Sequence, residues 1–389
     1  MLIENKTIAI IGGGMGGLTL ARLLQMQNAD VKVYERDTSQ DVRVQGSTLD
    51  LHEGTGLEAM KRAGLLDEFY KYHRPIASKM RIADKTLTVQ FDDHDSEKTI
   101  SEHRPEIDRA PLRDILLNSL HPNTVVWNSQ FVSMEKQNGG WRLHFKNGAS
   151  ADADIVIAAD GANSKVRPYL SEEKPVYSGV TLIEGNIYQA EKNAAKLFAF
   201  SKAGKVMAFG NEQTLMYGTK GDGSIMFVAS FKAPENWVTQ SGIDFKNKQQ
   251  VLAWFKEAYA GWSDGWQEFF TNDEVYFIPR PQYYFPFNQS WETQDNLTMI
   301  GDAAHRMPPF AGEGANVAMQ DAFELADCLT SEKFSDIRSA IAFFEKQMVA
   351  RAAEATKETL VNTEIMHSAT ALEQMIAFFS QVEDEDHSQ

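Results

Sequence analysis

The chain has 389 residues, of which 43% are hydrophobic and 24% are charged. This composition is typical of a globular protein, and the length predicts two domains, each with its own core. The formal net charge of −16 repels nucleic-acid phosphates and anionic membrane surfaces, so we expect neither as a partner.

The sequence also predicts a cytoplasmic location. The one cysteine, Cys328, excludes a disulfide framework and a thiolate-held metal cluster, which fits a reducing compartment. The first residues lack the basic start and apolar core of an export signal. No apolar run approaches the roughly 20 residues that span a membrane. We therefore expect a soluble protein.

The first predicted elements form a nucleotide-binding unit. The β-branched run at 7–11 is typical of a buried parallel strand, and a G-x-G-x-x-G motif separates it from an apolar-periodic helix. Gly12 permits the tight turn, Gly14 lets the backbone approach a pyrophosphate, and Gly17 lets the helix pack against the strand. A second strand at 31–34 ends at Glu35, where a carboxylate can accept ribose hydroxyls. A chance glycine turn with a surface acid is the weaker alternative.

Two later strands end in acid and glycine pairs. The strand at 155–159 runs into Asp160 and Gly161, which alone would be an ordinary loop. The strand at 297–300 runs into Gly301 and Asp302, and a glycine-lined segment then opens a long helix. An acid there can hold ribityl hydroxyls, and the helix start can face a flavin edge that becomes negative on reduction. The three motifs together predict FAD.

These motifs, in this order and spacing, resemble the class A flavoprotein monooxygenases, the family related to para-hydroxybenzoate hydroxylase. Within that family the chain is most similar to the Tet(X)-type tetracycline-inactivating enzymes. The segments that carry this likeness are 33–37, 46–52, 105–109 and 305–312. The resemblance covers nearly the whole chain and is weakest between about 171 and 291, where the substrate would be chosen.

The resemblance and the alternation of elements imply an α/β protein. We expect a discontinuous Rossmann-like FAD-binding domain at 1–72, 106–170 and 291–331. A substrate domain would use 73–105 and 171–290, with an antiparallel sheet predicted from strands at 180–188, 205–209, 214–217 and 225–231. C-terminal helices at 332–389 would include a helix to about Asn362 that bridges both domains. The acidic run at 383–386 is predicted to be a solvated, frayed end.

The implied activity is oxygen transfer from O2 to a phenol or enol, with NADPH as a transient co-substrate. Because reduced flavin and O2 carry that chemistry, no side chain is assigned a catalytic role. Arg109 and Arg113, four apart on one helix face, favour cofactor binding over surface ion pairing. Arg43 matches a position suggested for NADPH contact. The cofactor-binding positions implied by the resemblance are Gly12, Gly14, Gly17, Glu35, Arg36, Arg43, Asp50, Arg109, Arg113, Asp160, Asp302, Gly312, Ala315 and Asn316.

The substrate positions differ from those of the Tet(X)-type enzymes. A glutamine, an arginine and a histidine that contact the drug correspond here to Glu184, Lys205 and Met226, so the hydrogen-bonding groups are changed. Apolar pocket positions do match, which favours a flat polycyclic substrate. These are Pro309, Phe310, Gly312 and Met366.

Three functions are compatible with these residues. The first is hydroxylation of a tetracycline-type polycyclic enol, and the second is the same chemistry on another phenolic or polyketide metabolite. The third is a flavoprotein that sequesters a drug without oxidising it. No hydrolase or metal-ligand motif is present, so we expect no bound metal. We expect a monomer.

Overall fold

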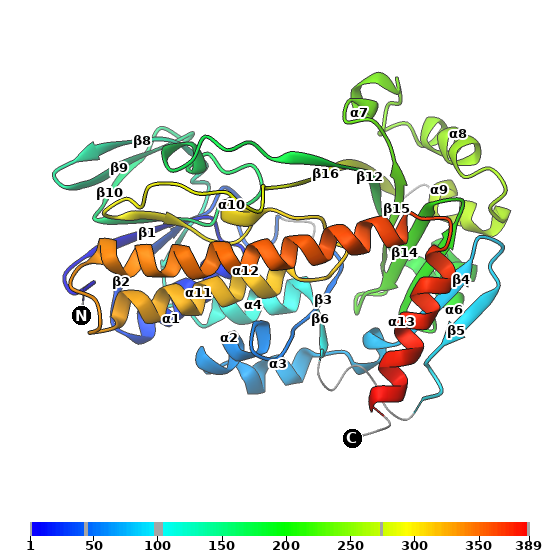
Figure 1. The fold of residues 1–389 in the computed structure, drawn as a ribbon, viewed down its shortest axis with the longest axis horizontal. Coiled ribbons are helices and arrows are strands. Elements are labelled where there is room, and N and C mark those ends of the chain that lie inside the picture. Colours follow the sequence, from blue (N-terminus) through cyan, green and yellow to red (C-terminus); the bar gives the residue numbers. More distant parts are fainter. Residues whose placement is uncertain (1, 43–45, 97–103, 273–274, 387–389) are drawn as a thin grey trace.

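A parallel five-stranded sheet organises one half of the molecule, as seen at the left of Figure 1. The computed structural model describes residues 2–42, 46–96, 104–272 and 275–386, with side chains to residue 381. Strand β2 lies on one side of β1 and strand β11 on the other, so the strand order reverses at β1. Such a reversal creates a crevice at the carboxyl ends of the strands. The sheet order is β17 (Leu297–Met299), β11 (Ile155–Ala158), β1 (Thr7–Ile11), β2 (Asp30–Tyr34) and β7 (Val125–Val126).

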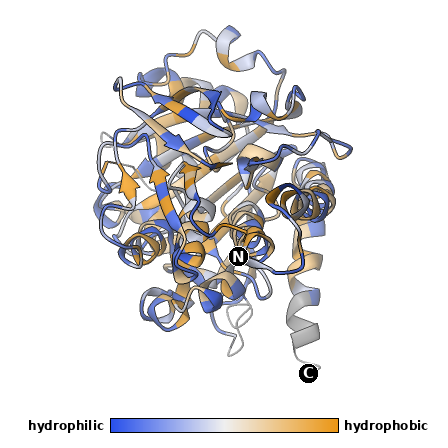
Figure 2. Ribbon diagram, turned by 90° about the vertical axis from the view of Figure 1, so that its left-hand side faces the viewer, coloured by the Kyte–Doolittle hydropathy of each residue, from blue (hydrophilic) through white to orange (hydrophobic). Residues whose placement is uncertain are grey.

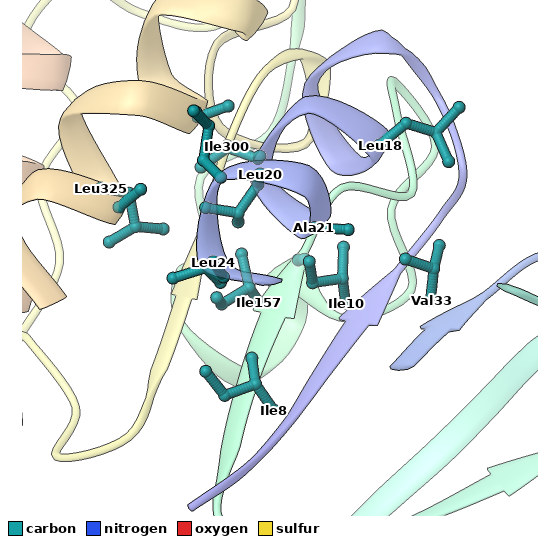
Figure 3. Close-up of a cluster of buried hydrophobic side chains, with 14 of the residues drawn as sticks. Ile8, Ile10, Leu18, Leu20, Ala21, Leu24, Val33, Ile157, Ile300 and Leu325 are labelled. Carbon is teal, nitrogen blue, oxygen red and sulfur yellow. The ribbon is translucent and has the colours of Figure 1, made fainter. Parts of the chain in front are cut away.

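Helices α1 (Met15–Met26) and α11 (Gly314–Thr330) pack together on this sheet. Figure 3 shows Leu20 and Leu24 of α1 close to Ile157 of the sheet, with Leu325 of α11 beside them. These side chains are fully buried. The predicted buried strands and the helix after the glycine motif are therefore confirmed, because burial on both faces selects continuous apolar strands.

Smaller elements complete this half. Near the sheet lie α4 (Arg109–Asn118), α2 (Gly56–Arg62) and α3 (Leu66–Tyr72). A three-stranded antiparallel sheet contains β8 (Phe131–Gln137), β9 (Gly140–Phe145) and β10 (Ser150–Ala153). A two-stranded sheet pairs β3 (Thr48–Asp50) with β6 (Glu106–Asp108). The sequence did not predict either of these small sheets.

A seven-stranded sheet organises the other half. Its order is β16 (Tyr276–Tyr284), β12 (Val176–Ile187), β15 (Ile225–Lys232), β14 (Gln213–Thr219), β13 (Lys205–Gly210), β4 (Met80–Asp84) and β5 (Val89–Asp92). The four predicted strands are present, and all neighbours pair antiparallel except β13 and β4. Strand β16 was not predicted, because Pro279 and Pro281 argue against a strand. Both prolines are tolerated because β16 lies at the sheet edge.

One face of the seven-stranded sheet packs on helices through an aromatic core. Phe227 of β15 stacks on Phe269 at a centroid distance of 4.4 Å, and Trp266 is completely buried nearby. The opposite face looks toward the first half of the molecule. The helices on the core side and at the sheet ends are α5 (Ala190–Asn193), α6 (Ala195–Ser201), α7 (Trp237–Gln240), α8 (Lys248–Ala258) and α9 (Glu268–Thr271).

Helix α12 (Ile337–Met366) runs along both halves in Figure 1, as the bridging helix was expected to do. Its first turn is capped by Asp336 and it continues four residues beyond the predicted end at Asn362. The turn after it is held by His367, whose Nε2 lies 2.5 Å from Ser230 Oγ on β15. Helix α13 (Ala371–Asp386) follows, so the backbone of the acidic run is helical rather than frayed, which corrects that prediction.

Hydrophobic segments gather on the interior strands and hydrophilic segments on the outer loops, as Figure 2 shows. Within the described ranges, no helix is both long and apolar enough to cross a bilayer. The expected domain bounds stay a prediction.

Candidate functional site

A cleft of about 850 Å³ lies between the carboxyl ends of the parallel sheet and the free face of the seven-stranded sheet. Its first wall contains the sequence motifs expected to bind a nucleotide. Its second wall contains the strand positions expected to choose a substrate. Because both walls line one continuous space, a bound cofactor and a substrate would be neighbours.

The glycine loop between β1 and α1 has a conformation that requires glycine. Gly12 has φ of +109°, and a Cβ there would lie 2.3 Å from the Ala159 carbonyl oxygen. A Cβ on Gly17 would lie 2.2 Å from the Gly12 carbonyl oxygen, so α1 could not approach the loop. Gly14 differs, because its Cβ would meet no atom within 4 Å, and it lines the cleft at the N-terminus of α1. The loop therefore leaves room at the end of the helix where an anion is favoured.

Glu35 is buried behind this loop. Its Oε2 accepts a hydrogen bond from the Gly13 amide at 2.7 Å, and its Oε1 accepts one from the Asp37 amide at 3.0 Å. The carboxylate thus fixes the loop, while its expected ribose contact stays a prediction. Arg36 is exposed. Arg43 falls outside the described residues.

Arg109 and Arg113 line the cleft from α4. Arg113 is 2% exposed, and its guanidinium donates to the Gln40 carbonyl at 2.9 Å and lies 3.8 Å from Asp37. The two cations lie on the same cleft wall as the glycine loop. This arrangement suits a pyrophosphate group.

The remaining acids of the flavin motifs have different positions. Asp302 opens α10 (Asp302–His305), is exposed and lines the cleft. Asp160 accepts the Lys165 amide at 2.7 Å, and burial raises the pKa of its carboxyl. It shapes the loop after β11 rather than the cleft wall, which includes its neighbour Asn163. Ala315 is half-buried in the first turn of α11.

Asp50 belongs to a charged group that the sequence analysis missed. His52 Nε2 lies 3.0 Å from Asp50, and His52 Nδ1 lies 3.2 Å from Glu313. Burial alone would lower the pKa of His52, but the two carboxylates raise it to about 9. Burial would likewise raise the pKa of Asp50, yet His52 and Lys205 lower it to about 2. At neutral pH the imidazolium therefore links the Asp50 strand to the loop before α11.

Asn316 reinforces the same link. Its side chain is fully buried, accepts the His52 amide at 2.9 Å and donates to the Asp50 carbonyl at 2.9 Å. The Asn316 side chain thus positions Asp50, whereas Gly312 lines the cleft with φ of +72°. The sequence signals for this arrangement are two short segments far apart in the chain. One holds Asp50 and His52, and the other is the G-E-G at 312–314.

Glu184, Lys205 and Met226 all line the cleft from the seven-stranded sheet. Glu184 accepts from the Arg280 guanidinium, with the longer of two contacts at 3.3 Å. The Lys205 ammonium is paired with the buried carboxylate of Glu106. Burial would lower the pKa of Lys205, but Glu106 and Asp50 raise it, so this ammonium remains charged. The sheet face therefore presents ion pairs next to the Met226 thioether.

Two expected substrate residues are buried beside the cleft, and their contact with a substrate stays a prediction. Phe310 and Met366 belong to a buried cluster with Leu182 and Phe209, between the seven-stranded sheet and the C-terminal helices. Phe310 also meets the His367 ring edge-to-face at 5.2 Å. Leu182 of the same cluster also lines the cleft, so this cluster reaches the cleft wall. Pro309 does line the cleft.

Strand β16 and the turn after α10 supply cleft residues that sequence reasoning did not assign. They are Arg280, Gln282, Tyr283 and Arg306. The two arginines were visible in the sequence. Their common location was not, because it depends on β16 pairing with β12.

One acidic cluster has the spacing of a metal site. Asp92, Asp93 and His94 each offer a ligand atom within 4.8 Å of the others. Asp92 is ion-paired with Arg81 at 2.7 Å and Lys202 at 3.2 Å. These cations already neutralise the carboxylate, so the cluster is better suited to joining strands than to holding a metal.

Comparisons with known proteins identify the family of this chain. A family model described as an FAD binding domain matches residues 5–333. Monooxygenase penA of Penicillium thymicola is 27% identical over 424 residues, covering 95% of this chain and 97% of that protein. Klebsiella pneumoniae HpxO complexed with FAD and uric acid has a TM-score of 0.75 at 20% identity, covering 97% of this chain and 93% of that chain. The tetracycline destructase Tet(55) has a TM-score of 0.75 at 19% identity, covering 94% and 90% respectively.

Proposed function

The chain belongs to the FAD-binding domain family of flavin monooxygenases, and on that premise we propose that it hydroxylates a polycyclic enol or phenol using NADPH and O2. The observation that carries this proposal is the single cleft shared by the flavin motifs and the seven-stranded sheet. A site that only stored a ligand would need no such junction.

The residues present fit FAD. The open space at Gly14 and the α1 N-terminus suit the pyrophosphate, and Arg109 and Arg113 add positive charge on the same wall. Asp50 and Asp302 would accept hydrogen bonds from hydroxyl groups of the ribityl chain, and Gly312 would lie next to the ring. Bound FAD would supply the redox chemistry for O2 activation, with NADPH as the source of electrons.

The chain's own residues would position the substrate and exclude water. Met207, Met216 and Met226 give the sheet wall an adaptable apolar surface, suited to a flat ring system. Glu184 and Lys205 would hold polar edges of that ring system. Fixed orientation and a dry surrounding are the contributions a protein makes when the cofactor performs oxygen transfer.

We propose a tetracycline-type antibiotic as the first substrate candidate, supported by the motif resemblance and the fold shared with Tet(55). A second candidate is another aromatic polyketide or phenolic metabolite. The ion pairs Glu184–Arg280 and Lys205–Glu106 favour this second candidate, because they would present charges to the substrate where the Tet(X)-type enzymes have different groups.

The test follows NADPH consumption and the tetracycline absorption band together, in air, with protein whose spectrum shows bound FAD. Loss of the drug band in step with NADPH supports the first candidate. NADPH loss stimulated by another phenol but not by tetracycline supports the second. Tight binding of either ligand without stimulated NADPH oxidation would instead favour sequestration and refute the proposal.

A matched pair of variants distinguishes an effect of the Glu184 charge on substrate binding from the effect of losing any carboxylate charge. Glu184→Gln removes a cleft charge, whereas Glu354→Gln removes one from the exposed side of α12 that pairs with Lys357. We expect only Glu184→Gln to change the half-saturating substrate concentration. Equal effects of both variants would argue against a substrate role for Glu184.

A further inference from the structure

Arg306 lies at the junction of the two cleft walls. It follows α10 directly, and its carbonyl accepts the Phe285 amide at 3.1 Å, which ties the turn to the chain just after β16. Its guanidinium carbon lies 4.7 Å from the centre of the Tyr283 ring. The side chain therefore has a defined place on the cleft wall.

Arg306 has fewer carboxylates close to it than three other cations of the cleft. Arg280, Lys205 and Arg113 each have a carboxylate within 4 Å. Across the described parts of the chain, no carboxylate lies within that distance of Arg306. Its one side-chain hydrogen bond there is a donation to the Pro281 carbonyl at 3.4 Å.

Burial makes this cation receptive to an anion. Arg306 is half-buried, and desolvation lowers the pKa of its guanidinium, opposed by the more distant Asp302. A guanidinium that has lost part of its hydration and has no ionic partner gains most from a ligand oxyanion, which can accept two parallel hydrogen bonds. The chain as a whole carries a net charge of −16, so a local cation site is needed to attract such a ligand.

We propose that Arg306 is the subsite for an oxyanion on the organic substrate, an ionised carboxylate or acidic enol attached to a flat ring. The flanking cleft residues Tyr283, Met307 and Pro309 supply an aromatic and apolar surface for such a ring. The substrate assignment rests on the proposed function, while the oxyanion subsite rests on the geometry alone. A phosphate of the pyridine dinucleotide is the other source of the same chemistry.

Isothermal titration calorimetry of the FAD-loaded protein tests this at neutral pH with two probes. They are 1-hydroxy-2-naphthoate and 1-hydroxy-2-naphthamide, which share the ring and hydroxyl and differ in one charge. We expect the wild-type protein to bind the acid about tenfold or more tightly than the amide. Arg306→Gln should abolish this preference and leave amide binding unchanged, and Arg306→Lys should retain part of it.

Arg338→Gln is the matched control, because Arg338 is exposed and pairs with Glu292 and Asp295 outside the cleft. It should behave like the wild-type protein, and thermal melting checks that all variants fold. Equal affinities for acid and amide in the wild type, including no detectable binding of either, overturn the proposal. So does an acid preference that survives in Arg306→Gln.

Titration with NADP⁺ distinguishes the two sources of the oxyanion. We expect Arg306→Gln to bind NADP⁺ like the wild type. Weakened NADP⁺ binding with unchanged acid binding would assign the subsite to a dinucleotide phosphate and overturn the substrate assignment. Because calorimetry needs no turnover, an Arg306-dependent acid preference in a protein that hydroxylates nothing would refute the proposed function and leave the subsite standing.

Discussion

At the scale of single residues, His52 shows how the fold creates a charge that could not be predicted from the sequence. It lies between Asp50 and Glu313, and its backbone is held by Asn316. An isolated histidine would be mostly neutral at physiological pH. Two carboxylates from distant parts of the chain keep this one protonated, and the cation in turn links Asp50 to the loop before α11.

The raised pKa of His52 predicts a pH-dependent contribution to stability. A pKa raised from 6.5 to about 9 on folding stabilises the protein fully below pH 6.5, and this contribution is lost as the pH rises through 9. We expect His52→Asn to lower the free energy of unfolding by about 2 kcal/mol at acidic to neutral pH, and by less above pH 9. Urea denaturation of both proteins across this range measures the difference.

Glu313→Gln is the companion variant, because it keeps the shape and removes one of the two charges. It should lower the pKa of His52 and shift the loss of stability to lower pH. A difference between wild type and His52→Asn that stays constant from pH 6.5 to 9 would contradict the assigned protonation.

At the scale of elements, one buried carboxylate joins three segments. Asp321 of α11 is completely buried, accepts the Gly301 amide at 2.9 Å and lies 2.5 Å from His305 Nε2. It also accepts from Arg351 of α12 at 2.7 Å. Burial would raise the pKa of Asp321, but His305 and Arg351 lower it, so it stays ionised. The long bridging helix is thereby fixed to the turn that presents Asp302.

Asp321→Asn should therefore loosen both α12 and the flavin motif at 301–302. Removing one partner of a buried ion pair leaves the other uncompensated, which costs about 3–5 kcal/mol. We expect a loss of this size in chemical denaturation, accompanied by weaker FAD retention. Glu324→Gln is the matched control, because Glu324 also accepts from Arg351, at 2.6 Å, but is partly exposed. A smaller effect of Asp321→Asn than of Glu324→Gln would refute this account.

At the scale of the whole molecule, the cleft exists because two separately packed cores are held face to face. One core surrounds the parallel sheet and the other lies on the far side of the seven-stranded sheet. A third buried cluster, under α12 and α13, joins them. A ligand that fills the cleft contacts both halves, so its binding should stabilise the folded molecule as a whole.

Two glycines allow this linkage to be tested. A ligand that binds only the folded state adds about 2.7 kcal/mol at a hundred times its Kd, so FAD should raise the Tm of the apoprotein. Gly14→Ala places its methyl group in open space at the cleft and should leave the apoprotein Tm unchanged while reducing the FAD-induced rise. Gly17→Ala places its methyl group against the Gly12 carbonyl and should lower the apoprotein Tm itself.

Differential scanning fluorimetry with and without FAD measures both the apoprotein Tm and the rise in Tm that FAD induces. If Gly14→Ala responds to FAD like the wild type, the cofactor does not approach the loop at this point. An apoprotein Tm of Gly17→Ala equal to that of the wild type would show that the loop can relax around the added methyl group.

The sequence by itself determined four of the five strands of the parallel sheet, the glycine loop and four strands of the second sheet. Each depends on local rules: continuous apolar residues in doubly buried strands, positive φ at Gly12, and alternation in antiparallel strands. The family could also be predicted, because its motifs are short and their spacing is set by strand and helix lengths.

Only the tertiary structure decided which side chains face the cleft. Arg280 meets Glu184 across 96 positions of sequence, and the His52 amide meets the Asn316 side chain across 264. Phe310 and Met366 were expected in the pocket, and the structure places them in the third core, which reaches the cleft wall at Leu182. Such pairings depend on strand register and helix docking between segments that are far apart in the sequence. Whether a side chain is buried, or its charge paired, is therefore decided by the tertiary structure.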